Sequence, residues 1–217
     1  MTTAPAPIVA SGILLALTVG RPQVVQAGQR PVSTAIWKQS VDGRVAVRGV
    51  NIDGDDQADR SVHGGPDKAV YAYAAEEVAQ WQAELGRDLD VAAFGQNLTT
   101  QGIEVSGAVI GERWRIGTTL LEVAQPRQPC FKLAIRMGDP RFVRRFAEAS
   151  RPGAYLRIVE PGELGAGDAI EVVHRPAHGV TSRLVFDALL RDPALVPQAL
   201  RAPELPAGLR HWMLSDS

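Results

Sequence analysis

The chain has a single cysteine, Cys130, in the segment VAQPRQPCFKL. Pro126 and Pro129 restrict the backbone just before it, and Arg127 lies between them. Cysteine binds metals or reacts as the thiolate, which nearby positive charge from Arg127 and Lys132 would favour. One cysteine excludes an intramolecular disulfide and zinc sites with two or more cysteine ligands. We therefore consider a metal ligand or a nucleophile, against the common alternative of a small, inert, buried side chain.

A second candidate segment has the sequence VHGGPDK. Its Gly-Gly-Pro run fits neither a helix nor a central strand, so we expect a tight loop with His63 and Lys68 on its two sides. The backbone N–H groups of Gly64 and Gly65 could face an anion, and Lys68 would add a positive charge for a phosphate. A plain turn with an exposed histidine and lysine is the alternative.

Two further polar segments lie near these candidates. The acidic segment DGDDQAD lacks the spaced glycine and the terminal glutamate of a calcium-binding EF-hand loop. We therefore expect a solvated turn rather than a metal site at Asp53, Asp55, Asp56 and Asp59. The segment AAFGQNLTTQGI is expected to be a loop that either completes a pocket or only turns the chain; its polar residues include Asn97, Thr99 and Thr100.

A cysteine hydrolase is a competing interpretation, because Cys130 and His63 could meet in space as nucleophile and base. Such nucleophiles usually lie at the N-terminus of a helix. Pro129 and the strand expected before it do not favour that arrangement.

Most of the chain is typical of short strands separated by glycine-rich turns. The apolar run SGILLALTVG predicts a buried strand at 13–19; no Lys or Arg precedes it as in a signal peptide, and it is too short to span a bilayer. Alternating valines predict a half-buried strand in GRVAVRGV. Further strands are expected at 113–116, 119–124, 154–160 and 169–174.

Helices are expected at three places. Residues 73–86 are helix formers that end in glycine, and residues 139–150 begin with an Asp-Pro cap and have one aromatic face. The remaining region, 177–217, predicts two or three short helices broken by proline and too small for a core of their own. We expect them to pack on a main domain at 11–176 or on a second subunit, with 1–10 as a loose lead-in.

Composition limits the classes of partner. The chain has 217 residues, 45% of them apolar and 22% charged, as in a globular protein with a substantial core. The net charge of -1 gives no electrostatic reason to expect a nucleic acid or a membrane surface as partner. A single cysteine fits a reducing compartment, so we expect a cytoplasmic protein.

Four motifs in this order resemble the MOSC family, the domains related to the C-terminal part of molybdenum cofactor sulfurases. The motifs are GDDQAD…VHGGPDKAVYAY, FGQNLTT, IGERWRIG…LEVAQPRQPC and GAYLRIVEPGELGAGD. The resemblance extends from about Gly12 to about Thr181 and is strongest to the stand-alone 6-N-hydroxylaminopurine resistance proteins. It implies a mainly β fold with some α: a MOSC-type β-barrel with flanking helices and a small C-terminal helical appendage.

The resemblance also implies a site. The resemblance implies that the chain binds a molybdenum cofactor, in which molybdopterin holds the metal, with a cysteine as the protein ligand to molybdenum; here that residue is Cys130. His63 and Arg127 would be catalytic beside it. The implied cofactor-binding residues are Thr34, Lys38, His63, Gly64, Gly65, Asp67, Lys68, Asn97, Gln125 and Arg127. Gln96 departs from the glutamate of many relatives, which puts proton transfer by that side chain in doubt.

The implied activity is the reduction of small N-hydroxylated compounds, such as hydroxylaminopurine, to amines. Electrons would come from a separate reductase, because the sequence has no flavin motif and one cysteine cannot hold an iron–sulfur cluster. The first alternative is a sulfur carrier with a persulfide on Cys130. Pyridoxal phosphate is associated with the family only, since this chain is too short for a desulfurase domain beside the barrel. A cysteine hydrolase or a plain binding domain, and a homodimer, are further alternatives.

Overall fold

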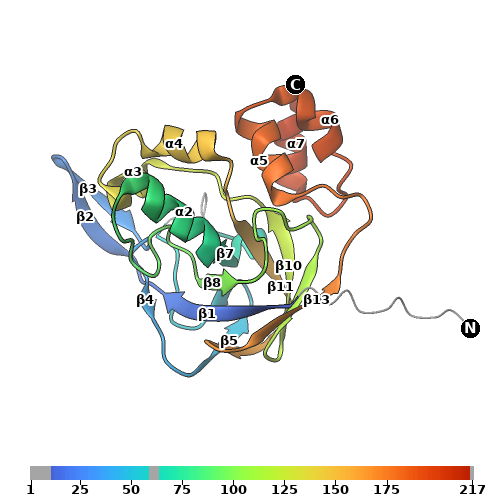
Figure 1. Ribbon diagram of the computed structural model, residues 1–217, viewed down its shortest axis with the longest axis horizontal. Helices are drawn as coiled ribbons and strands as arrows, with labels where there is room; N and C mark the ends of the chain where they lie inside the picture. The colour runs from blue at the N-terminus through green and yellow to red at the C-terminus, as the bar shows by residue number, and fades with distance from the viewer. Residues whose placement is uncertain (1–10, 59–63, 216–217) are drawn as a thin grey trace, which may run out of the picture.

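A closed β-barrel forms the centre of the protein (Figure 1). The structure is a computed structural model that describes residues 11–58 and 64–215. Seven strands follow one another in the order β13, β9, β10, β11, β7, β8 and β1, and β1 pairs back with β13 to close the barrel. Neighbours are antiparallel except β7 and β8. The strands are β1 (Ser11–Val19), β7 (Val70–Ala74), β8 (Leu98–Gln101), β9 (Arg113–Ile116), β10 (Thr119–Gln125), β11 (Ala154–Glu160) and β13 (Ala169–His174). The expected barrel is confirmed.

The barrel interior is filled by aliphatic side chains and one tryptophan. Burial alternates along β13, where Ile170 and Val172 point into the barrel, as expected for a strand with one solvent-exposed face. Strands β7 and β10 are instead buried along their whole length because helices cover their outer faces. The inner cluster includes Leu14, Leu121 and Trp114.

A second, aromatic core lies outside the barrel, under helices α2 (Ala75–Leu85), α3 (Phe131–Met137) and α4 (Phe142–Ala149). Its rings pack on one another; the ring planes of Trp81 and Phe146 are parallel, and their centroids lie 6.1 Å apart. The expected helix at 73–86 begins two residues later, because the residues before Ala75 belong to β7 and pair with β11 and β8. The second expected helix is present as α4. Helix α3 was not predicted.

Smaller strands extend from the barrel. A hairpin of β2 (Gln23–Ala27) and β3 (Arg30–Thr34) projects from the body, and β4 (Gln39–Ser40) pairs with β1 (Figure 1). A three-stranded sheet contains β12 (Gly162–Gly165), β5 (Arg44–Arg48) and β6 (Asn51–Ile52). The expected Gly-Gly-Pro loop is a single 3₁₀ turn, η1 (Pro66–Lys68), entered through Gly65 with φ at 95°. A side chain would be strained at that φ, so the glycine is required here.

The C-terminal region is helical, as expected, and it packs against the barrel. It comprises α5 (Ser182–Leu190), η2 (Pro193–Leu195), α6 (Val196–Ala199) and α7 (Ala207–Ser215). Val185, Ala199 and Met213 join the barrel's apolar cluster, which explains how such short helices are held. No helix among the described residues is long and apolar enough to cross a membrane.

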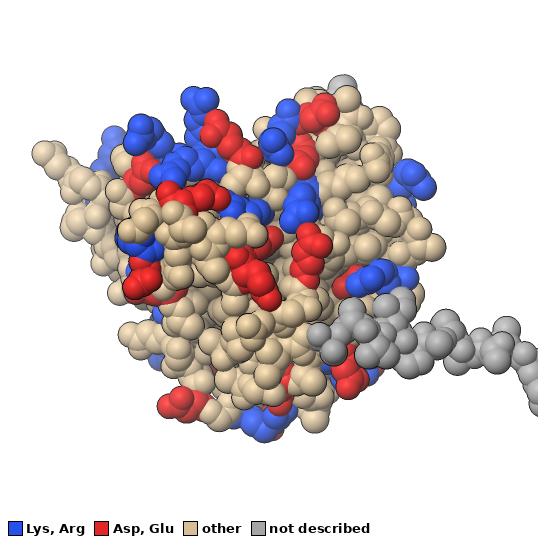
Figure 2. Space-filling model, viewed as in Figure 1, with Lys and Arg blue, Asp and Glu red and all other residues tan. Residues whose placement is uncertain are grey.

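The face that carries α2, α4 and α5 has basic and acidic side chains side by side (Figure 2). Several of them pair across elements, as Arg151 does with Glu84 at 2.6 Å and Arg183 with Glu104 at 3.0 Å. This face therefore has no large region of one charge.

Candidate functional site

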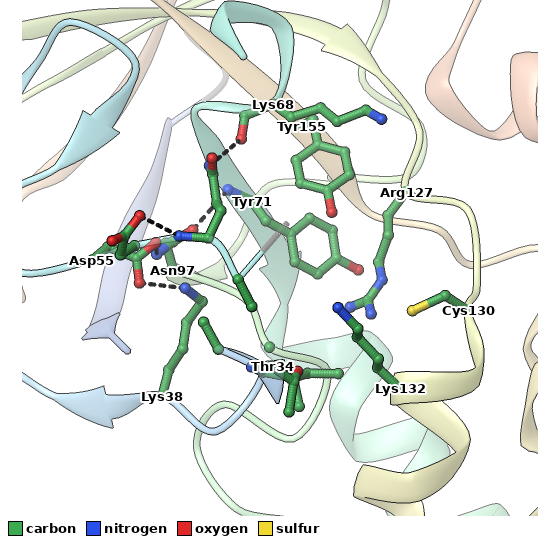
Figure 3. A pocket seen from close by; sticks show the side chains of 16 residues that line it. Thr34, Lys38, Asp55, Lys68, Tyr71, Asn97, Arg127, Cys130, Lys132 and Tyr155 are labelled. Carbon is green, nitrogen blue, oxygen red and sulfur yellow. Dashed lines mark hydrogen bonds and ion pairs between the residues drawn. The ribbon is translucent and has the colours of Figure 1, made fainter. Parts of the chain in front are cut away.

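A pocket that is open to solvent brings most of the candidate residues together (Figure 3). Its walls come from the segment after β3, the turn before residue 59, the end of η1, strands β7 and β11, and the loop that leads into α3. The pocket thus lies where the barrel meets the aromatic core. Its predicted members are Thr34, Lys38, Lys68, Asn97, Arg127 and Cys130.

Cys130 is partly exposed at the entrance to helix α3, in extended conformation as the N-cap residue. Figure 3 shows its sulfur directed into the pocket towards Arg127. We did not expect a helix start at this residue, and that expectation is wrong. The residues after it, FKLAIRM, are good helix formers, and Gly138 ends the helix in left-handed conformation with φ at 68°.

Arg127 is buried and fixed from two sides. Its guanidinium carbon lies 5.1 Å from the centroid of the Tyr71 ring, and its Nη1 donates to the carbonyl oxygen of Phe94. The ring of Tyr155 packs 5.1 Å from that of Tyr71. Burial raises the pKa of both phenols, so they stay protonated at neutral pH. Arg127 is therefore a buried part of the pocket lining that carries a permanent positive charge beside Cys130.

Lys38 and Asp55 form a buried ion pair at the opposite wall. Asp55 also accepts from the backbone N–H of Gly20 at 2.7 Å and from Asn97 Nδ2 at 3.0 Å. Its side chain is 2% exposed, so the expected solvated turn is wrong at this residue. Burial lowers the pKa of Lys38, and Asp55 partly offsets this effect. The pair largely neutralises this side of the pocket.

Asn97 lies at the base of this wall, and its side chain is fully used inside the protein. Its Oδ1 accepts from the N–H of Tyr71 at 3.1 Å, while Nδ2 donates to the carbonyl of Thr18 at 3.1 Å as well as to Asp55. These bonds join β7, β1 and the acidic turn. Asn97 therefore positions Asp55, and both of its amide hydrogens have partners within the protein.

Two further lysines reach the pocket. Lys68 comes from the end of η1, and partial burial lowers its pKa while Asp67 partly offsets this. Lys132 comes from the first turn of α3, and Figure 3 shows its ammonium group directed towards Arg127. Thr34 lies buried at the end of β3, where its hydroxyl accepts from the N–H of Ile36 at 3.2 Å. Four basic side chains therefore line the pocket together with two acidic ones, Asp55 and Asp56, and the lining has a net positive charge.

Four predicted residues lie beside the pocket rather than in it. Gly64, Gly65, Asp67 and Gln125 line a neighbouring groove that shares Lys68 with the pocket. Asp67 pairs with Arg157 at 2.8 Å, and Gln125 Nε2 donates to the carbonyl of Asp67 at 3.2 Å, so both side chains hold η1 in place. His63 lies outside the described residues.

Gln96, the departure from the family pattern, does not line the pocket. Its side chain is buried, donates to the carbonyl of Val91 at 2.7 Å and to Thr99 Oγ1 at 3.1 Å, and accepts from the N–H of Phe94. An amide satisfies this environment, which has both donors and acceptors. Gln96 therefore acts as a hydrogen-bonding residue of the fold.

Sequence reasoning missed Tyr71 and Tyr155 as members of the site. Both lie within motifs that carried the family resemblance, VYAY and GAYL, and that coincidence was the only sequence signal for them. The described residues contain no group of three or more His, Cys, Asp or Glu side chains placed to hold a metal ion. Any metal at Cys130 would therefore need most of its ligands from elsewhere.

Sequence comparison identifies relatives of the chain. A profile of the MOSC domain matches residues 59–171. The uncharacterized protein YflK of Bacillus subtilis is 37% identical over 168 residues, which cover 77% of this chain and 76% of YflK. Protein YiiM of Escherichia coli is 32% identical over 154 residues, covering 70% and 69%. A protein of Gibberella moniliformis named reductase is 36% identical over 180 residues, 81% of this chain but only 31% of that longer protein.

Structural comparison agrees with these matches. The crystal structure of YiiM from Geobacillus stearothermophilus superposes with a TM-score of 0.76 at 26% identity, covering 94% of this chain and 98% of that one. The profile match spans more than half of the chain, and the barrel and its flanking helices are shared with a YiiM structure. The chain therefore belongs to the MOSC domain family.

Proposed function

We propose that the protein binds a molybdenum cofactor through Cys130 and reduces small N-hydroxylated compounds, such as hydroxylaminopurine, to amines. The observation that carries this proposal is a lone thiol directed into a cationic pocket. Arg127 is fixed by Tyr71 and Phe94, and Lys68 and Lys132 reach the same space. A thiolate is a soft ligand that suits molybdenum, and the cations suit an anionic pterin phosphate.

The set of donors in the pocket fits this cofactor. Among the described residues no cluster of ligands could hold a metal ion unaided, and one protein ligand is enough when the organic cofactor supplies the others. Arg127 and Lys132 would hold the phosphate and the Cys130 thiolate. Tyr71 and Tyr155 would form an aromatic wall for the pterin, since their rings pack on each other and Tyr71 contacts Arg127.

The reaction consumes two electrons and two protons: R–NHOH becomes R–NH₂ and water, with the N–O bond broken. When bound, the cofactor would supply the two-electron couple that this cleavage of the N–O bond requires. A separate reductase would deliver the electrons, and the relative named reductase is consistent with such chemistry. We assign Lys68 as the proton donor, because it lines the pocket with Cys130 and burial lowers the pKa of its ammonium group, which makes it a stronger acid.

A sulfur carrier is the second candidate, and the partial exposure of Cys130 favours it. A donor protein needs access to the thiol, and the neighbouring Phe131 is exposed at the same helix start. In this function Cys130 would hold a persulfide received from a desulfurase and pass it onward.

Metal analysis separates the two candidates. Protein from a host that makes the cofactor would be assayed for molybdenum per chain and for oxidised pterin, in wild type, Cys130→Ala and the neighbouring control Phe131→Ala. We expect about one molybdenum in wild type and Phe131→Ala and none in Cys130→Ala. Absence of metal and pterin from all three proteins would contradict the proposal. A persulfide on Cys130 found by mass spectrometry would then support the sulfur carrier.

A further inference from the structure

A second groove, also open to solvent, adjoins the Cys130 pocket. The two share Lys68, and Gln128 in the groove is two residues from Cys130 in the pocket. The walls of the groove come from η1, from the loop before α3 and from the C-terminal helix α7. A ligand that reaches from one to the other would pass Lys68.

Trp212 supplies a flat apolar wall in this groove. It is 44% exposed, whereas Trp81 and Trp114 are buried. Its helix is firmly held, because Met213 is buried in the barrel cluster and Arg210 donates to the carbonyl of Ala202 at 2.7 Å. Stacking of a ligand ring on a partly exposed indole is favourable. Because the helix that carries Trp212 is already fixed, binding requires no reordering of the backbone.

The polar groups around Trp212 match the edge of a heteroaromatic ring. Gln128 is exposed in the same groove and offers an amide that both donates and accepts, while Gly64 and Gly65 have no side chains and let a ligand approach the backbone. Base rings bind proteins by this combination of stacking on an aromatic side chain and hydrogen bonds to the ring edge. A small aliphatic ligand would leave the indole uncovered.

We propose that this groove binds the planar ring of the substrate, stacked on Trp212, with the N-hydroxyl group directed past Lys68 towards Cys130. Trp212 is then a specificity-determining residue that selects for a flat ring next to the N-hydroxyl group. This inference rests on the proposed function for the direction of the substrate, but ring binding can be measured without metal or electrons. It assigns the C-terminal helix a part in specificity.

Equilibrium binding of 6-N-hydroxylaminopurine tests this proposal. Titration calorimetry gives Kd, and tryptophan fluorescence reports stacking on Trp212. We expect Trp212→Ala to raise Kd about tenfold, or ~1.4 kcal/mol, and Trp212→Phe to retain most of the affinity. Gln128→Ala should raise Kd roughly threefold by removing the edge contact. Leu214→Ala, on the same helix but outside the groove, should leave Kd unchanged.

The outcomes separate this inference from the proposed function. If wild type does not bind the purine, or if Trp212→Ala and Gln128→Ala both bind as wild type does, the groove is not the ring site. If the ring binds through Trp212 but protein loaded with metal reduces nothing, the proposed reduction fails and the binding site stands. Thermal melting of each variant excludes misfolding as the cause of lost affinity.

Discussion

Asn97→Ala tests whether this residue supports the site from within the fold or holds a ligand directly. The side chain is 4% exposed and makes three hydrogen bonds, to the N–H of Tyr71, the carbonyl of Thr18 and the carboxylate of Asp55. Alanine would remove all three and leave the partners in Tyr71, Thr18 and Asp55 unsatisfied in a buried place. The backbone hydrogen bonds of residue 97 would remain.

The expected loss follows from these contacts. Two neutral hydrogen bonds contribute about 1 kcal/mol each, and the bond to the buried carboxylate contributes about 1.5–3 kcal/mol. Asn97→Ala should therefore lower the free energy of unfolding by about 3.5–5 kcal/mol, a large part of the 5–15 kcal/mol that is typical of a domain. With an m-value of about 2 kcal/mol/M, the urea midpoint would fall by roughly 2 M.

Urea unfolding of wild type, Asn97→Ala and Asn51→Ala provides the assay. Asn51 is a matched control because it also donates to Asp55, but only once, to the backbone carbonyl at 2.8 Å. Asn51→Ala should cost about 1 kcal/mol. Molybdenum content measured on the same preparations shows whether the site is lost in step with stability.

One result would refute this reasoning. If Asn97→Ala lowers the free energy of unfolding by less than about 1 kcal/mol while molybdenum is lost completely, Asn97 contacts the cofactor directly. The three hydrogen bonds would then carry little of the stability assigned to them.

Two further predictions concern buried charges. Arg127→Lys loses the contact with Tyr71 and the hydrogen bond to Phe94, so it should lower the free energy of unfolding by about 2–3 kcal/mol. The control is Arg144→Lys, because the Arg144 side chain is 84% exposed; it should change the free energy of unfolding by less than about 0.5 kcal/mol. Urea unfolding measures both variants. Burial raises the pKa of Glu77, and Ser106 and Arg183 offset this only in part, so at a pH between the unfolded and folded pKa values the folded protein holds a proton there that the unfolded chain releases. That contribution is lost as pH rises through the folded pKa. Glu77→Gln, which removes this titration, should therefore become more stable relative to wild type as pH rises above about 4.3, the ordinary pKa of a glutamate; a stability difference in urea unfolding that does not change with pH would contradict the assignment.

Several elements could be predicted from local pattern alone. Strands β11 and β13 have the expected limits, because their apolar and polar residues alternate and glycine-rich turns bound them. The C-terminal helices were also expected, since their breaks coincide with prolines. Such signals need no knowledge of the neighbours in space.

Other elements exist only because of their neighbours. Leu98–Gln101 has the polar composition of a loop, and we expected one, but it forms β8 because it pairs in parallel with β7 and antiparallel with β1. Tyr73 has the context of a helix start, yet it lies in β7, where it pairs with Thr99 of β8. Pairing between distant segments outweighed local preference in both cases.

The sequence by itself determined the chemistry available to this protein: one cysteine, stiffened by two prolines and accompanied by Arg127, within motifs typical of the MOSC family. Only the tertiary structure decided how that chemistry is arranged. Folding buries Asp55 against Lys38, places Arg127 on Tyr71, and moves Gly64, Gly65 and Gln125 to a neighbouring groove. The physical reason is that burial and pairing depend on segments far apart in the sequence, as between Gly12 and Ile170 of the paired strands β1 and β13, and no local pattern contains that information.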